Sequence, residues 1–303
     1  MSQTTRELTR RIKGVRQIMK ITKAMELVAA AKMRRSVAAA LASRSYAARA
    51  WELLASLSET TDPNLHPLLR ESDGQRGLIV VFSPDRGLAG GLSTRLIDLT
   101  LEEARSFGDL PFDVVAVGKK AETGLRRRKL NIVAAFPNPR QMPLLADALP
   151  IARLVIDEYR RGAYHRAVLI WTDYQSPLVQ RTESRLLLPI TREELKEMIE
   201  QSGAVRQKVK LPTEPAGTEY LFEPSAETVL EAMLTRLVEM QVYQVLLEAT
   251  ASEHAARMMT MRSANDAADD LVNELTFEYN QARQSGITQD LAELSATRLA
   301  LEA

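Results

Sequence analysis

Residues 10–35, RRIKGVRQIMKITKAMELVAAAKMRR, combine a strong positive charge with a helical apolar pattern. They contain nine Lys or Arg and one acid, Glu26. Apolar side chains recur at the three- or four-residue spacing of one face of an α-helix. They form two neighbouring stripes, Leu8, Ile12, Val15 and Met19, and then Ile18, Ile21, Met25 and Val28. Because Thr4 to Leu57 contains no Pro and only one Gly, the pattern predicts a single long helix.

The C-terminal quarter has the most regular apolar spacing in the chain. Steps of four and three residues from Met233 reach fifteen positions, of which twelve are apolar or aromatic. These positions are Met233, Leu237, Met240, Gln244, Leu247, Ala251, His254, Met258, Met261, Asn265, Ala268, Val272, Leu275, Tyr279 and Ala282. This spacing is the heptad seam of a coiled coil, and the polar positions His254 and Asn265 on it are more typical of register setting than of chemistry.

Between the two helical ends, short apolar runs alternate with helical segments. Strands are predicted at 78–82, 112–117, 131–136 and 167–172, and helices at 92–106, 119–128 and 144–161. Nearly continuous apolar strands alternating with helices indicate a parallel sheet covered on both faces. An edge strand is predicted at 182–190. The fold class is therefore α/β plus coiled coil, with a central Rossmann-like, doubly wound α/β domain.

The predicted lengths fix how the parts are connected. At 1.5 Å per residue, the two terminal helices are about 80 and about 110 Å long, whereas a compact α/β unit has a radius of gyration near 13 Å. Both helices must therefore extend beyond that unit and pair with each other, antiparallel because the chain reverses between them. The predicted segments are 1–60 for the N-terminal helix, 77–190 for the α/β domain, 191–223 for a linker and 224–303 for the C-terminal helix.

The charge is polarised along a nearly neutral chain. The net charge is +1, but residues 1–50 hold twelve Lys or Arg against two acids, and residues 248–303 hold ten acids against four Arg. There is no cysteine, which excludes disulfides and thiolate chemistry. No apolar run is long enough to span a bilayer, and no signal peptide is recognisable, so a cytoplasmic location is expected.

Three long motifs resemble the γ subunit of F-type ATP synthases. They are KITKAMELVAAAKM at 20–33, SPDRGLAGG at 83–91 and LTFEYNQARQSGITQDL at 275–291, in the order of that family. The resemblance implies an asymmetric shaft inside a ring of three α and three β subunits, with the α/β domain binding the ε subunit and the membrane rotor c-ring. It implies one copy per complex, on the cytoplasmic face of the membrane, in a bacterial source.

The resemblance also implies which residues contact other subunits. Lys20, Lys23 and Lys32 correspond to a basic surface that moves past acidic loops of the β subunits. Met25 corresponds to a position facing a β subunit. Arg257, Arg283, Gln284 and Thr288 correspond to polar contacts with a β-subunit loop, and such charge-assisted hydrogen bonds are stronger than neutral ones.

Other functions fit the residues less well. SPDRGLAGG follows a strand where dinucleotide phosphates bind in doubly wound folds, but its glycines lack the G-x-G-x-x-G spacing, which favours a tight turn and close packing instead. The three histidines are scattered without ligand spacing. We expect no cofactor, metal, catalytic residue, nucleic acid or small-molecule substrate. The alternatives are a basic coiled-coil protein with a nucleotide- or nucleic-acid-binding domain and a homomeric structural coiled coil.

Overall fold

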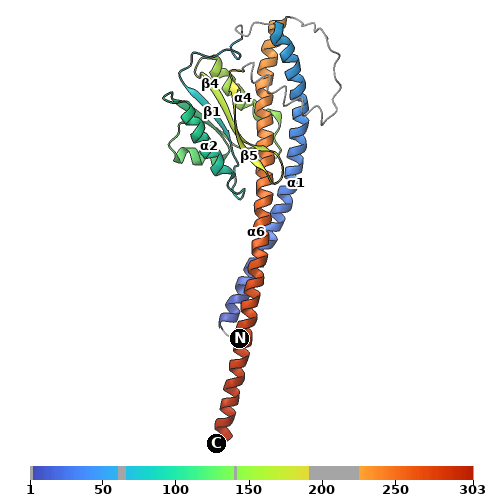
Figure 1. Ribbon diagram of the computed structural model, residues 1–303, viewed down its shortest axis with the longest axis vertical. Coiled ribbons are helices and arrows are strands. Elements are labelled where there is room, and N and C mark those ends of the chain that lie inside the picture. The colour runs from blue at the N-terminus through green and yellow to red at the C-terminus, as the bar shows by residue number, and fades with distance from the viewer. Residues whose placement is uncertain (1–2, 61–65, 140–141, 191–224, 303) are drawn as a thin grey trace. The chain divides into compact units, whose positions relative to one another are not determined.

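The structure, a computed structural model, describes residues 3–60, 66–139, 142–190 and 225–302 (Figure 1). Two long helices flank a five-stranded sheet in the chain order. The elements are α1 (Gln3–Thr60), β1 (Gly77–Phe82), α2 (Leu92–Ser106), β2 (Phe112–Val117), α3 (Lys119–Arg127), β3 (Ile132–Phe136), α4 (Leu145–Arg160), β4 (Arg166–Tyr174), β5 (Gln180–Leu188) and α6 (Ala226–Glu302). The predicted strands and helices are confirmed to within a few residues at each end.

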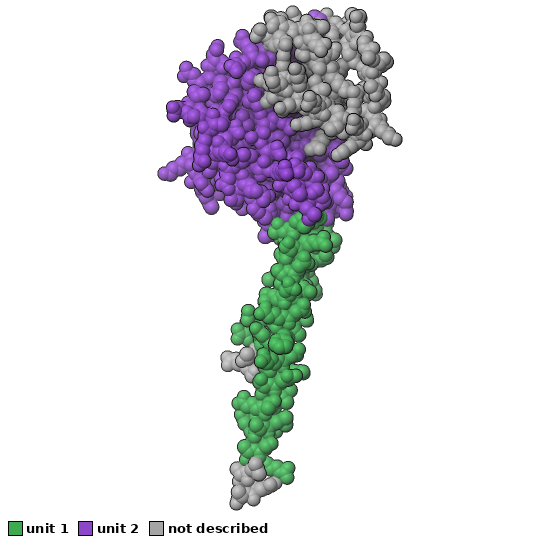
Figure 2. Space-filling model, in the orientation of Figure 1, with its two compact units in different colours: residues 1–29, 257–303 green, residues 30–256 purple. Residues whose placement is uncertain are grey.

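The chain divides into two compact units (Figure 2). The bounds of α1 and of α6 include residues of both units. Residues 1–29 and 257–303 form a purely helical unit, which we call the helical unit. Residues 30–256 contain the sheet and are called the sheet unit. The predicted linker at 191–223 lies outside the described residues, and the predicted domain boundaries remain predictions.

The sheet has the order β3-β2-β1-β4-β5. The first four strands in this order are mutually parallel, and β5 pairs antiparallel with β4. The predicted edge strand is thus confirmed as β5. Because each parallel connection returns through a helix, α2, α3 and α4 all end at the edge of the sheet where the strands begin.

Both faces of the sheet are covered, as the apolar strands predicted. Alternate residues of β1 point to opposite faces. Ile79 and Val81 belong to a core with α2 and α3, which contribute Leu96 and Leu125. The other face of β1 belongs to a larger core that includes Val155 of α4 and residues of α6.

The first third of α6 is therefore part of the sheet unit's core, which the heptad pattern did not predict. Leu230, Leu234, Val238, Val242 and Val245 of α6 join the core of α4 and the sheet. All six residues from 237 to 242 are buried, so the helix is covered on every side there. The predicted seam positions account for only part of this burial.

The helical unit holds two antiparallel stretches of helix side by side (Figure 1). On α1, Leu8 is buried and Ile12, Val15 and Met19 are half-buried, and on α6 Met261, Val272 and Leu275 are buried. The hydroxyl of Thr22 lies 3.1 Å from the amide oxygen of Asn265. This contact agrees with the predicted role of Asn265 in setting register. All fifteen predicted seam positions are buried or half-buried across the two units.

The second apolar stripe of α1 is more exposed than the first. Ile18, Ile21 and Val28 are all more than half exposed, and Met25 alone is half-buried. The predicted pairing of the two long helices therefore buries the first stripe of α1 and leaves most of the second exposed. The pairing of two helices covers about one stripe on each, so a second stripe some 100° away needs another partner.

Candidate functional site

An exposed apolar surface runs along the helical unit. On α1 it consists of Ile18, Ile21, Leu27 and Val28, whose exposed fractions lie between 55% and 61%. On α6 it consists of Phe277, Ile287, Leu291 and Leu294, whose exposed fractions range from 50% to 72%. Ile287, Leu291 and Leu294 are spaced four and three apart, so they share one face of α6. An exposed apolar face of this kind on one helix is typical of a protein contact site.

The predicted cationic positions are exposed on α1. Lys20 lies in the helical unit, and Lys32 lies in the part of α1 that belongs to the sheet unit. Lys23 is also exposed, but its Nζ donates to Glu26 at 2.9 Å within the same helix. The positive charge of Lys23 is thus partly offset by Glu26, which entered the sequence analysis only as part of the net charge of the segment.

The predicted contact residues of α6 differ in exposure. Arg257 is half-buried, whereas Arg283, Gln284 and Thr288 are exposed. From residue 287 to residue 298 every side chain is exposed, so this stretch of α6 has no cover within its unit. The structure brings Arg283, Gln284 and Thr288 onto the same two turns, beside the apolar residues Ile287 and Leu291.

The polar groups of the SPDRGLAGG loop form hydrogen bonds with the chain's own helix α3. The hydroxyl of Ser83 accepts the amide hydrogen of Ala121 at 2.6 Å, and a carboxylate oxygen of Asp85 accepts that of Lys119 at 2.9 Å. The carbonyl of Pro84 accepts the amide hydrogen of Lys120. These are the amide groups with which a helix N-terminus would hold a phosphate. The loop therefore caps α3 from within the chain.

Gly118, the residue before α3, makes this close approach possible. Gly118 has a φ of +92°, and a Cβ there would lie 1.9 Å from the carbonyl oxygen of Ser83. Gly90 has a φ of +59° in the turn before α2. Only glycine adopts the first conformation without strain. Gly90 agrees with the predicted tight turn. Close packing is seen at Gly118, which lies outside the SPDRGLAGG loop, whereas a Cβ on Gly87 or Gly91 would meet nothing closer than 3.8 Å.

A buried carboxylate fastens the edge of the sheet where the parallel strands begin. Asp113 of β2 is 4% exposed and accepts hydrogen bonds from Arg76 at 2.9 and 2.5 Å, from Asn131 at 2.6 Å and from Tyr164 at 3.0 Å. Burial by itself raises the pKa of Asp113, but these donors outweigh burial and hold the pKa below its ordinary value. Asp113 is thus ionised and joins the segments before β1, β3 and β4.

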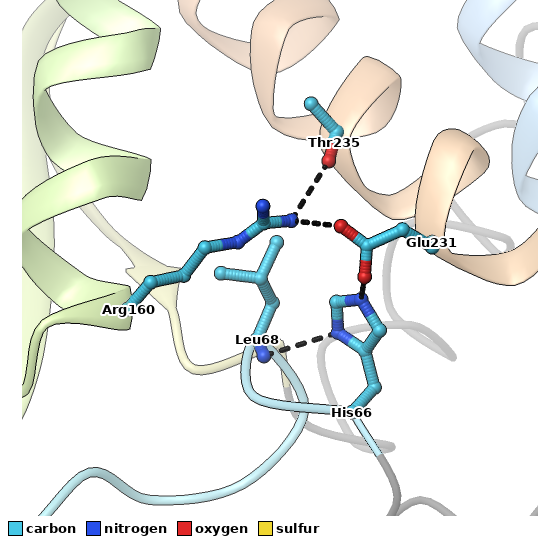
Figure 3. Close-up of polar contacts among 5 residues, drawn as sticks. All are labelled: His66, Leu68, Arg160, Glu231 and Thr235. Carbon is cyan, nitrogen blue, oxygen red and sulfur yellow. Dashed lines mark hydrogen bonds and ion pairs between the residues drawn. The ribbon is translucent and has the colours of Figure 1, made fainter.

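A second polar cluster links α6 to α4 and to the segment that begins at residue 66 (Figure 3). Glu231 of α6 accepts from Arg160 of α4 at 2.5 Å, and its other oxygen lies 2.6 Å from Nε2 of His66. Arg160 also donates to Thr235 at 3.1 Å. Sequence reasoning missed this cluster, because its members share no motif and His66 and Glu231 lie 165 positions apart.

The tautomer of His66 follows from its partners. The Leu68 amide hydrogen is donated to Nδ1 at 3.1 Å, so Nδ1 is unprotonated and Nε2 carries the proton that Glu231 accepts. Burial lowers the pKa of His66, and the nearby Arg160 cation acts in the same direction, against the opposing influence of Glu231. The pKa of Glu231 is also lowered, by its contacts with His66 and Arg160, which outweigh the opposing effect of burial. We infer a neutral imidazole donating to a charged carboxylate.

The described residues contain no group of His, Cys, Asp and Glu side chains that could hold a metal ion. Within the same residues, no helix combines the length and apolar character needed to cross a bilayer. A cavity of about 400 Å³ lies between α2 and β5 and is lined by both acidic and basic side chains, including Glu71, Glu103, Arg166 and Arg185. The mixed charge of this lining indicates no class of ligand.

Comparison with known proteins places the chain in one family. The family model described as ATP synthase matches residues 4–301. The ATP synthase gamma chain of Desulfitobacterium hafniense is 37% identical over 99% of this chain and 99% of its own length. That of Moorella thermoacetica is 37% identical over 98% of this chain and 99% of its own.

Solved structures agree at the level of the fold. A chain of the Euglena gracilis mitochondrial ATP synthase superimposes with a TM-score of 0.65 at 19% identity, covering 98% of this chain and 94% of its own. A chain from the central stalk and c-ring of the Tetrahymena thermophila mitochondrial enzyme gives a TM-score of 0.57 at 22% identity, covering 80% of this chain and 99% of its own. On the family match and the length of the alignments, the chain belongs to the ATP synthase gamma chain family.

Proposed function

We propose that this chain is the central rotor shaft of a rotary ATP synthase. Its α1 and α6 form an antiparallel coiled coil that turns inside a ring of three α and three β subunits. The sheet unit, a Rossmann-like domain, is the foot that binds the ε subunit and the membrane c-ring at the cytoplasmic face. One copy couples ion-driven rotation to ATP synthesis, and ATP hydrolysis drives the same cycle backwards.

The observation that carries this proposal is the apolar surface left exposed on the helical unit. Every described side chain from residue 287 to residue 298 of α6 is exposed, so the apolar face of this stretch has no cover within the unit, whereas most helices in proteins gain their stability from packing such a face. Burial of apolar surface contributes roughly 25 cal/mol per Å², so a surrounding sleeve would stabilise this stretch. A sleeve around a shaft also accounts for the second stripe of α1, which the pairing with α6 leaves exposed.

The exposed cations suit a contact that must be made and broken repeatedly. Lys20, Lys23 and Lys32 are proposed to pass acidic loops of the β subunits during rotation. An exposed ion pair contributes only about 0 to 1 kcal/mol and is screened by salt. Such weak pairs guide the surfaces without holding the rotor in one position.

The polar residues of α6 and Met25 of α1 are proposed as the specific contacts with the β subunits. Arg283, Gln284 and Thr288 are exposed on adjacent turns, which allows all three to reach one loop of a neighbouring subunit. Arg257 and Met25 are half-buried, so each presents only part of its side chain. We propose that these residues recognise the β subunits, while the apolar stripes supply the bearing surface.

The proposed chain carries out no bond chemistry itself. An ion that crosses about 100 mV releases roughly 2.3 kcal/mol, so several ions must act through one element that holds strain between steps. An asymmetric shaft presents a different side to each β subunit and thereby favours a different conformation in each. The proposed function therefore depends on a mechanically continuous shaft that transmits rotation. A nucleotide-binding role is not favoured, because the SPDRGLAGG loop uses its groups to cap α3.

The absence of cysteine allows a clean test, since any introduced cysteine is the only thiol in the chain. We would introduce Leu291→Cys at the uncovered part of α6 and, as the matched control, Leu178→Cys in the turn between β4 and β5. Both side chains are exposed in the free chain, by 59% and 75%. Maleimide should label both variants alone, but only Leu178→Cys after assembly with α and β subunits.

A rod attached to Leu178→Cys in an immobilised complex should then rotate stepwise in one direction when ATP is added. Equal labelling of Leu291→Cys before and after assembly would refute the sleeve. A stationary rod in a complex that still hydrolyses ATP would refute the shaft.

A further inference from the structure

We propose that Glu231 and Arg160 form the joint that fastens the shaft to the foot and fixes the rotational position of α6. This inference rests on the proposed function, in which torque must pass between α6 and the sheet. Glu231 lies at the beginning of α6, and Arg160 is the last residue of α4. Their carboxylate and guanidinium meet at 2.5 Å (Figure 3).

The geometry restrains α6 in more than one direction. The two oxygens of Glu231 are held by different elements, one by Arg160 and the other by His66. Arg160 reaches a second turn of α6 through Thr235. Bonds to both carboxylate oxygens, together with a second contact one turn further along α6, give this junction a defined geometry.

The surrounding apolar contacts do not supply this restraint. Leu230 and Leu234 are buried in the core shared with α4, and burial opposes separation of the two helices. The hydrophobic effect is non-directional, so it resists sliding or rolling of packed helices far less than it resists their separation. We infer that the directional bonds at Glu231 add angular restraint to this packed contact, although the Arg160 and Glu231 side chains are 34% and 49% exposed.

The His66 side of the joint reaches the end of the sheet. The amide of Leu68 donates to His66, and the carbonyl of Leu68 accepts the Ile190 amide hydrogen at 2.9 Å. Tyr159 of α4 donates its hydroxyl hydrogen to the Arg70 carbonyl at 2.9 Å. Force on Glu231 is thus passed to α4 and to the chain just after β5. We infer that Glu231 and Arg160 are positioning residues for torque transmission.

The neighbouring residue offers a matched control. Arg161 adjoins Arg160 and is exposed, but its guanidinium pairs with Glu158 of α4 at 2.7 Å, three positions earlier in the chain. Arg160→Gln removes a bond between α4 and α6, whereas Arg161→Gln removes the same type of group and a bond within one segment. Glu231→Gln is the reciprocal variant, which keeps the size of the side chain.

The test measures angular fluctuation in the assembled complex. The α and β subunits are immobilised, a rod is attached to Leu178→Cys in the foot, and the spread of rod angles is recorded during ATP-binding pauses. We expect Arg160→Gln and Glu231→Gln to broaden the angular variance about two-fold with unchanged ATP hydrolysis, because a softer joint fluctuates more at the same temperature. Arg161→Gln should leave the variance unchanged.

Hydrogen exchange of the complete chain gives an independent measurement. Amide exchange at Leu68 and over residues 228–235 should accelerate about five-fold in Arg160→Gln and Glu231→Gln, relative to Arg161→Gln, because local opening becomes easier. Equal variance and equal exchange in Arg160→Gln and Arg161→Gln would overturn the joint. Failure of every variant, and of the parent chain, to assemble or rotate would instead overturn the proposed function.

Discussion

Replacement of Asp113 by Asn tests whether the sheet is held together at its starting edge by one buried charge. The substitution keeps the size of the side chain and removes its negative charge. It also replaces one acceptor oxygen by an NH₂ group, which faces donors from Arg76, Asn131 or Tyr164. Each oxygen accepts two of the four hydrogen bonds, so the NH₂ group faces two donors whichever oxygen it replaces, and at least one of those bonds is lost.

The expected loss of folding stability in Asp113→Asn follows from how far its hydrogen-bond partners are buried. A hydrogen bond to a charged group contributes about 1.5 to 3 kcal/mol, and loss of one partner of a buried pair costs about 3 to 5 kcal/mol. The Arg76 side chain is 42% exposed, so water replaces part of what it loses. We expect a loss of about 2 to 3 kcal/mol at neutral pH, or about 1 M in the urea midpoint.

The effect should depend on pH in a defined direction. The pKa of Asp113 is lower in the folded chain than its ordinary value of 3.8, so the unfolded state binds the proton first as pH falls. The stabilisation by the charge is present above about pH 4 and is lost as pH falls further, through the folded-state pKa. The difference between the parent chain and Asp113→Asn should be equal at pH 7 and pH 5, and smaller at pH 3.

Urea unfolding followed by the fluorescence of Trp171 gives the measurement, in a Trp51→Phe background so that one tryptophan reports. Trp171 is buried in the sheet unit. The exposed Asp98→Asn on α2 is the matched control and should leave the midpoint unchanged. Equal midpoints for Asp113→Asn and Asp98→Asn at pH 7, or a difference that does not shrink at pH 3, would refute the reasoning.

Two further substitutions test the backbone and the helix pairing. Gly118→Ala should destabilise the sheet unit by about 3 kcal/mol or more, because the added Cβ would lie 1.9 Å from the Ser83 carbonyl oxygen. Gly14→Ala, where a Cβ would have nothing within 4 Å, should stabilise α1 by up to about 1 kcal/mol. Urea unfolding measures both changes in stability, and equal effects would contradict the close contact at Gly118. Leu275→Ala should destabilise the helical unit by about 2 to 4 kcal/mol, because Leu275 is buried, whereas Leu294→Ala should change its stability by almost nothing, because Leu294 is exposed. Hydrogen exchange of α6 in the free chain measures both. Similar losses of stability would show that Leu275 is not in a packed seam.

Sequence periodicity predicted the elements well because their apolar patterns are long or bounded by turns. The strands 78–82 and 112–117 were predicted within one residue of β1 and β2. The exposed fractions of Lys20, Arg283, Gln284 and Thr288 also agree with a surface role. Their roles as contacts with other subunits came from resemblance and remain predictions, since the single chain contains no partner with which to test them.

The polar clusters could not be predicted, because they depend on distances across the fold. Asp113 meets Arg76 and Tyr164 only when β2 and the segments before β1 and β4 share one edge of the sheet. The sequence near His66 contains no partner for it, because Glu231 lies 165 positions further along the chain. Such pairings leave no periodic signal in either segment.

The heptad pattern of α6 is continuous, but its physical meaning changes along the helix. Near residues 237–242 every side is buried by the sheet unit, and between 258 and 282 mainly one side is covered. From 287 to 298 no side is covered, although Ile287, Leu291 and Leu294 continue an apolar spacing. Periodic apolar residues thus predict that one face of a helix is buried, but they do not predict which element or subunit covers it. The cover is the chain's own sheet in the first part and α1 in the second, and in the third we propose that other subunits supply it.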